Sequence, residues 1–193
     1  MNLNHECLKD LSDGNEIGNE IGNVIFLDID GVLNNMRCMK FGEHMDIECA
    51  RHLRRIVNHA NCDIVISSTW RIGNSTHNLR EIFYPWGLYR IIGKTCTNFP
   101  HSTGMRGDEI KAWIDTFGCK NYLILDDDTD MLSSQKDHFI NTDGFVGLTE
   151  EQSTYAIRNI FGVTTPFCPE CNGYGRVNGY DKCGTCNGKI LRL

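Results

Sequence analysis

The sequence has no long apolar run and no excess of basic residues. No stretch of its 193 residues approaches the roughly 20 apolar residues that span a membrane, so we expect no integral membrane protein. Lys and Arg number 19 against 25 Asp and Glu, a net charge of −6, which argues against a generally basic nucleic-acid-binding surface. Residues 1–20 have neither a basic start nor an apolar core and do not resemble a secretory signal, so we expect a cytoplasmic protein.

Cysteine, by contrast, is abundant. Six of the ten cysteines occur singly and four form two tight pairs near the C-terminus. Because no secretory signal accompanies them, this distribution favours a metal site in a reducing compartment over a disulfide framework. We expect the single cysteines to be small buried residues. They are Cys7, Cys38, Cys49, Cys62, Cys96 and Cys119.

The paired cysteines form two CxxC motifs separated by 11 residues, a spacing that predicts one tetrahedral zinc knuckle with four cysteine ligands. The ligands would be Cys168, Cys171, Cys183 and Cys186. Four thiolates leave no open coordination position, so we expect Zn²⁺ to be structural and to fold a tail too short for its own core. A protein or RNA partner is a further role for this tail, and a redox-active pair is the less favoured alternative.

Apolar patterns that predict strands and helices alternate along the chain. Continuous apolar runs predict buried strands at 24–28, 63–67 and 121–126, with a short edge strand at 138–140, and periodic patterns predict helices at 46–60, about 108–117 and 149–161. Residues 72–105 are less periodic. The alternation predicts an α/β fold with a mainly parallel sheet and helices on both faces. We expect a flexible arm at 1–22, an α/β domain at 23–165 and a zinc-binding tail at 166–193.

Polar residues follow three of the predicted strands. Asp28-Ile29-Asp30-Gly31, Ser67-Ser68 and Asp126-Asp127 would converge if the strands are neighbours, since ligands bind beyond the carboxyl ends of parallel strands. Side-chain alternation lets Asp28 and Asp30 point the same way, and Gly31 permits a sharp turn. Several carboxylates together favour a hard divalent cation such as Mg²⁺. One carboxylate could act as a nucleophile and another as a general acid and base.

These residues resemble the motifs of the haloacid dehalogenase (HAD) superfamily. Residues 28–34, DIDGVLN, resemble the first motif of its phosphatases, residues 64–67 the second and residues 123–127 the fourth, in the right order over 24–162. Three further stretches resemble the small-capped HAD domains of Swiss Army Knife nucleic-acid repair proteins. They are 67–71 (SSTWR), 106–110 (RGDEI) and 147–149 (GLT). The resemblance implies a HAD-like Rossmannoid fold with a minimal cap.

The resemblance also implies roles for individual residues. Asp28 would be the nucleophile, Asp30 the general acid and base, and Ser67 the phosphate ligand, with Ser68 as the alternative. The third motif requires one cation, for which Arg106 fits best, followed by Lys111 and Lys94. Mg²⁺ would be held by Asp28, the Asp30 backbone carbonyl and Asp126, with Asp127 close by. The tail resembles the CxxCxGxG repeats of J-domain co-chaperones, although its second copy lacks the final Gly.

The short segments between the motifs leave little room for a cap and therefore predict an open site. We expect a Mg²⁺-dependent phosphatase that acts on a nucleotide or a nucleic-acid terminal phosphate. The alternatives are a small-metabolite phosphatase, or a catalytically idle scaffold whose zinc tail binds protein or RNA. Several aromatic and basic residues could contact a nucleotide or belong to the core. They are Trp70, Arg71, Tyr84, Trp86, Tyr89 and Arg90. A local basic face would need the zinc tail or Arg51, Arg54, Arg55, Arg71 and Arg90.

Overall fold

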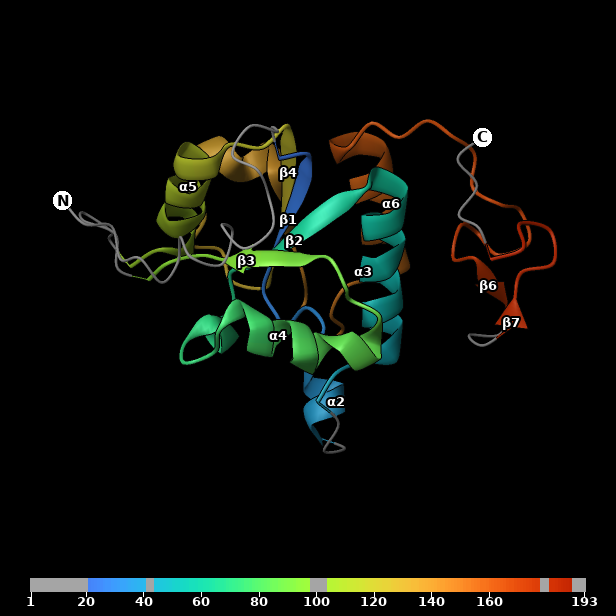
Figure 1. Cartoon of the computed structure of the whole chain (residues 1–193), viewed down its shortest axis with the longest axis horizontal. Coiled ribbons are helices and arrows are strands. Elements are labelled where there is room, and N and C mark those ends of the chain that lie inside the picture. Colours follow the sequence, from blue (N-terminus) through green and yellow to red (C-terminus); the bar gives the residue numbers. More distant parts are fainter. Residues whose placement is uncertain (1–20, 41–43, 98–103, 178–180, 189–193) are drawn as a thin grey trace.

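The computed structural model describes residues 21–40, 44–97, 104–177 and 181–188, and a parallel five-stranded sheet lies at its centre (Figure 1). The strand order is β3-β2-β1-β4-β5. The strands are β1 (Asn23–Leu27), β2 (Cys62–Ile66), β3 (Ile91–Lys94), β4 (Asn121–Asp126) and β5 (Phe139–Asn141). The predicted α/β fold with a mainly parallel sheet is therefore confirmed.

Both faces of the sheet are covered, which explains why the strands are continuously apolar. Along β1, Ile25 and Leu27 belong to one hydrophobic cluster, whereas Val24 and Phe26 belong to the other. Helices α3 (Ile47–Ala60), α4 (Thr76–Phe83) and η4 (Ala156–Ile160) contribute to the first cluster, and α5 (Arg106–Phe117) to the second. In Figure 1, α3 and α5 accordingly lie on opposite sides of β1 and β2.

The helix boundaries follow from capping groups that the sequence displays. Asp46 caps α3 by accepting hydrogen bonds from the backbone N–H groups of Glu48 and Cys49. Thr149 and Gln152 form the expected capping box of α6 (Glu150–Tyr155). The helix expected to continue to Phe161 changes after α6 into a single π-helical turn, η4.

Most of what the sequence did not predict lies in 72–105. This segment contains α4, which Ser75 caps, and the whole of β3. The segment also contains η2 (Tyr84–Trp86), and the short elements elsewhere are α2 (Met36–Lys40), η1 (Thr69–Arg71) and η3 (Ser133–His138). Within the described residues, the segments that separate the first, second and third HAD-like motifs hold only α2, α3, η1, α4, η2 and β3, with no separate cap domain.

The tail contains a small antiparallel hairpin of β6 (Arg176–Val177) and β7 (Asp181–Lys182), which lies beyond α3 from the sheet (Figure 1). Most of the arm expected at 1–22 lies outside the described residues. Cys38, Cys49 and Cys62 are buried as expected, whereas Cys96 is disulfide-bonded, so the expectation for that cysteine is wrong. Across the described ranges, no helix combines the length and apolarity that crossing a membrane would require.

Candidate active site and zinc site

The register of the sheet places three polar residues at one edge. Leu27 in β1 lies opposite Ile66 in β2 and Leu125 in β4, so Asp28, Ser67 and Asp126 come next on neighbouring strands. The backbone N–H of Asp28 donates to the Leu125 carbonyl, and that of Ser67 donates to the Leu27 carbonyl. The convergence of these strand ends is therefore present in the structure.

Asp28, Asp126 and Asp127 form an acidic cluster. One carboxylate oxygen from each residue lies within 4.8 Å of the other two. Asp126 is fully buried, and its Oδ2 has no hydrogen-bond partner among the described residues. Burial, reinforced by the charge of Asp28, raises the pKa of Asp126 to about 7. A set of closely spaced, mutually repelling carboxylates, of which Asp28 and Asp126 are buried, fits a hard divalent cation. The Asp30 carboxylate is not part of this cluster.

Arg106, the first residue of α5, contacts two of these carboxylates. Its Nη1 lies 3.0 Å from Asp28 Oδ1 and 3.3 Å from Asp126 Oδ2, and also donates to the Ser67 carbonyl. Burial lowers the pKa of Arg106, but Asp126 and Asp28 outweigh that effect and keep it above the usual value. Asp130 accepts from the Arg106 backbone N–H at 2.8 Å and so fixes the start of α5.

The two lysines considered for the same role make other contacts. Lys111 forms an exposed ion pair with Asp115 at 2.6 Å. Lys94 donates to the carbonyl oxygens of Arg71 and Asn74. Of the three candidates for the third-motif cation, Arg106 is therefore the one that the structure brings to Asp28.

The two serines after β2 differ in their contacts. The hydroxyl of Ser68 hydrogen-bonds to Asp28 and, like Arg106, lowers the pKa of that carboxyl, although burial raises it overall. The hydroxyl of Ser67 is buried without a partner among the described residues. Ser68, which the sequence analysis gave as the alternative to Ser67, is therefore the serine that contacts Asp28.

Arg71 lies under this loop rather than on the surface. Its Nη1 donates to the carbonyls of Ser67 and Ser68 at 2.6 Å, and its Nη2 pairs with Glu109 at 2.5 Å. Both charged side chains of this pair are buried. Of the two roles that the sequence left open for Arg71, a nucleotide contact or a place in the core, the structure places it in the core, where its contacts hold the serine loop in place.

Asp30 is held by two donors that the sequence did not identify in this role. Trp70 Nε1 donates to Asp30 Oδ2, and Asn34 Nδ2 donates to Asp30 Oδ1, both at 3.0 Å. The Trp70 ring also packs against Phe83, with 6.0 Å between ring centroids. Trp70 belongs to the SSTWR stretch and Asn34 to DIDGVLN, so the signal lay within recognised motifs.

Gly31 leaves the space that the Asp127 carboxylate occupies in the cluster. Its φ of +74° lies in the left-handed region, and a Cβ built there would be 2.1 Å from Asp127 Oδ2. Gly144 approaches the same oxygen from another loop, where a Cβ would be 2.9 Å away. The acidic site therefore depends on the absence of side chains at two positions.

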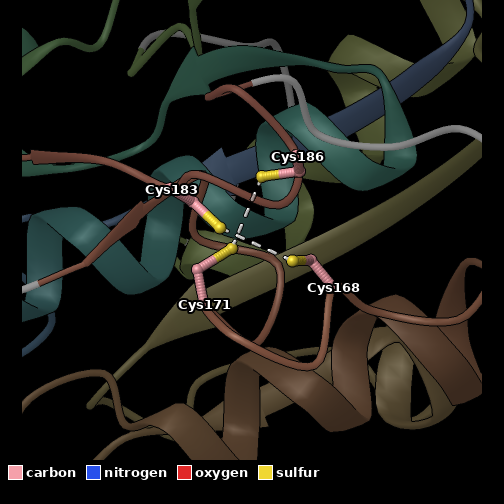
Figure 2. A group of neighbouring side chains, drawn as sticks. All are labelled: Cys168, Cys171, Cys183 and Cys186. Atoms are coloured by element: carbon pink, nitrogen blue, oxygen red, sulfur yellow. Dashed lines mark hydrogen bonds between the residues drawn. The ribbon is translucent and has the colours of Figure 1, made fainter.

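The four paired cysteines gather in the tail with their sulfur atoms directed at one another (Figure 2). All four Sγ atoms lie within 4.8 Å of each other, and all four residues are buried. The Gly175 backbone N–H donates to Cys171 Sγ at 3.2 Å, as in knuckles where amides approach metal-bound sulfur. This donor set fits a zinc site with four cysteine ligands.

The fold and the acidic site define a HAD-type α/β protein. The model of one family, the HAD domain in Swiss Army Knife RNA repair proteins, matches residues 24–153, and the chain belongs to this family. Searches of curated proteins and of solved structures give no match.

Proposed function

We propose that this chain is a Mg²⁺-dependent phosphatase that hydrolyses a phosphomonoester through an aspartyl-phosphate on Asp28. The observation that carries this proposal is the placement of Arg106 between Asp28 and Asp126, beside a separately held Asp30. The HAD family membership supports hydrolase chemistry of this class.

In the proposed first step, an Asp28 carboxylate oxygen attacks phosphorus and the bond to the leaving oxygen breaks. Asp30 gives its proton to that oxygen. In the second step, water attacks the aspartyl-phosphate and passes a proton to Asp30, which frees Asp28 and releases phosphate. Asp30 thus returns to its starting protonation state, and the atoms and charges balance over the cycle.

Other residues would bind the phosphoryl oxygens and organise the acids. Ser68, and Ser67 as the first sequence candidate, would donate to phosphate, while Arg106 offsets the negative charge of Asp28 and Asp126. Asp28, Asp126, Asp127 and the Asp30 carbonyl would hold Mg²⁺. When bound, the cation would neutralise these carboxylates and a phosphoryl oxygen.

A nucleotide or a nucleic-acid terminal phosphate is the proposed substrate. The RNA repair proteins that share this family support it, as does the lack of a separate cap domain in the described residues. Phe145, 67% exposed, directly follows Gly144, where a Cβ would lie 2.9 Å from Asp127 Oδ2. An exposed ring at this position is suited to stacking on a base.

For the tail, we propose a structural Zn²⁺ bound by the four cysteines. We further propose that residues 23–165 form the phosphatase domain and residues 166–193 the zinc-binding tail. All four candidate ligands are thiols, so they leave no coordination position for the water molecule that a catalytic zinc ion binds.

The deciding experiment measures phosphate release from an aryl phosphate with Mg²⁺ and with EDTA. We expect Mg²⁺-dependent turnover in the wild type and a loss of about 1,000-fold or more in Asp28→Asn. Asp115→Asn, an exposed carboxylate on α5, is the matched control and should keep full activity. Equal turnover in Asp28→Asn and the wild type would overturn the mechanism.

Substrate class is tested by comparing four phosphomonoesters at equal concentration. These are a mononucleotide, a 3′-phosphorylated oligonucleotide, a 5′-phosphorylated oligonucleotide and a sugar phosphate. We expect the highest kcat/KM for one of the nucleotide substrates. A preference for the sugar phosphate would instead indicate a small-metabolite phosphatase.

A further inference from the structure

The cysteine-rich tail packs directly onto α3. Arg55 Nε donates to the Asn172 carbonyl at 3.0 Å, and its guanidinium lies over the rings of Phe167 and Tyr174. His59 Nε2 contacts the Gly173 carbonyl at 3.0 Å, and His52 Nδ1 the Tyr174 hydroxyl at 2.7 Å. These contacts fix the tail relative to the helix and create a surface that belongs to neither part alone.

A cleft of about 370 Å³ opens between α3 and the tail. Its walls come from three parts of the chain: α3, the segment before β3, and the β6–β7 region. Its charged and aromatic lining residues include Arg51, Arg54, Arg55, Tyr89, Arg176 and Lys182. None of them belongs to the acidic site.

The cleft concentrates positive charge on a chain whose net charge is −6. Five of its lining residues are cationic and none is a carboxylate. Burial lowers the pKa of Arg54, and the nearby charges of Arg176 and Arg51 lower it further. Like charges held this closely repel one another, and a bound anion would relieve that repulsion.

Several donors in the cleft are not used by the protein. Arg55 is 1% exposed, and its Nη2 is a buried donor without a hydrogen-bond partner. Over the described ranges, the side chains of Arg54 and Lys182 form neither a hydrogen bond nor an ion pair with another residue. A buried unpaired donor is costly, so an acceptor from outside is the simplest account of Arg55.

An aromatic pair stands at the rim. Tyr89 lines the cleft and is 66% exposed, and its ring meets that of Tyr84 edge-on with 5.1 Å between centroids. Exposed rings beside a row of cations are the combination with which proteins bind single strands, by stacking bases and neutralising phosphates. A small anion alone would not need the rings.

We propose that this cleft binds the sugar–phosphate backbone of a single-stranded nucleic acid, with Tyr89 stacking on a base. The cations would contact consecutive phosphates, and Arg55 would reach the most deeply placed one. This inference is independent of the phosphatase proposal, because it depends on different residues and is tested by binding rather than by turnover.

The test measures fluorescence anisotropy of a labelled 20-nucleotide RNA without terminal phosphates, in EDTA-free and Mg²⁺-free buffer that preserves bound zinc. The zinc-loaded full chain is compared with Arg54→Gln/Lys182→Gln. Lys111→Gln/Lys136→Gln, which removes the same charge from exposed positions elsewhere, is the matched control. We expect the cleft variant to bind at least tenfold more weakly and the control within twofold of wild type. The slope of log Kd against log salt concentration should flatten by about 1.4 in the cleft variant alone, because each neutralised phosphate of a single strand contributes about 0.7.

Two further arms keep the proposal falsifiable. Tyr89→Ala should weaken RNA binding about tenfold without changing the salt slope. Equal losses in the cleft and control pairs would overturn the proposal in favour of general charge attraction. Binding of poly-glutamate or inorganic phosphate as tight as that of RNA would overturn it in favour of a protein or small-anion site. Unchanged zinc content and circular dichroism verify that each variant is folded.

Discussion

The indole N–H of Trp70 donates to Asp30 Oδ2 at 3.0 Å, while Asn34 donates to the other oxygen of the same carboxylate. Two donors from different loops therefore fix the plane of the Asp30 carboxyl group. A general acid must point at the leaving oxygen, so Trp70 is a positioning residue in the proposed reaction.

Trp70→Phe should remove this donor while keeping the ring that packs against Phe83. A hydrogen bond to a charged group contributes about 1.5–3 kcal/mol, so we expect kcat to fall at least tenfold with little change in KM. The loss should be larger for an alkyl phosphate than for p-nitrophenyl phosphate, whose leaving group needs little protonation. Trp86→Phe is the control, since Trp86 packs on the same core without touching Asp30. Equal losses for both substrates would show that Trp70 acts only through packing.

Ser68→Ala and Ser67→Ala form a matched pair that separates two neighbouring hydroxyls. Because the Ser68 hydroxyl contacts Asp28 and that of Ser67 has no partner in the described structure, Ser68→Ala should reduce kcat/KM about tenfold or more. Ser67→Ala should have a smaller effect. Steady-state kinetics with the aryl phosphate measures both. The reverse order would assign the phosphate contact to Ser67, as its alignment with the second HAD motif suggests.

Gly31→Ala and Gly73→Ala compare two glycines with nearly equal positive φ, +74° and +76°. Both substitutions introduce backbone strain of about 1–2 kcal/mol. Only at Gly31 does the new Cβ clash with Asp127, so only Gly31→Ala should displace a carboxylate and reduce activity, by at least 100-fold. Thermal melting and kinetics of the pair distinguish the two effects. A similar loss of activity at Gly73 would show that strain, rather than the clash, is responsible.

The sequence identified the strand ends well because each is a continuous apolar run that stops at an acid or a serine. Asp28 and Asp126 could be placed together on the condition that their strands are neighbours, and the structure pairs β1 with β4. In contrast, α4 and β3 were missed because 72–105 mixes polar and apolar residues without a sustained period. The buried face of β3 is only two residues, Ile91 and Gly93.

Hydrophobic periodicity could not predict the contacts between side chains that lie on different loops. One of the two donors to Asp30 is Trp70, 40 residues away, and the sequence left open whether that ring stacks on a base or packs in the core. Similarly, nothing in the sequence distinguishes Arg71 from Arg54. In the structure, Arg71 forms a buried ion pair with Glu109, whereas Arg54 lines the cleft beside α3. Which arginine remains exposed is set by tertiary pairing, not by local composition.

Cys171→Ser should release zinc and loosen the tail while the domain around Asp28 stays folded. The serine hydroxyl is a much poorer zinc ligand than a thiolate, and the remaining three cysteines leave an incomplete site. We expect zinc content to fall from about one equivalent per chain to well below half, measured by inductively coupled plasma mass spectrometry. Cys119→Ser, outside the cluster, is the control and should keep its zinc. Equal zinc content and equal melting of Cys171→Ser and the wild type would refute the zinc proposal.

Docking of the tail on α3 should weaken in mild acid because of His59. Burial lowers the pKa of His59, and Arg55 on the same helix and Arg158 on η4 lower it further, despite the bond to Gly173. The unfolded chain, with a histidine pKa of about 6.5, therefore binds a proton at a pH where the folded chain does not. The stability that neutral His59 contributes is present above pH 6.5 and is lost as the pH falls below that value.

His59→Gln does not titrate, so its melting temperature should fall less than that of the wild type between pH 7.5 and 5.5. Protonation of His52 and of the cysteines is common to both proteins and cancels in the comparison. Parallel melting curves over this range would exclude His59 as a source of the pH dependence.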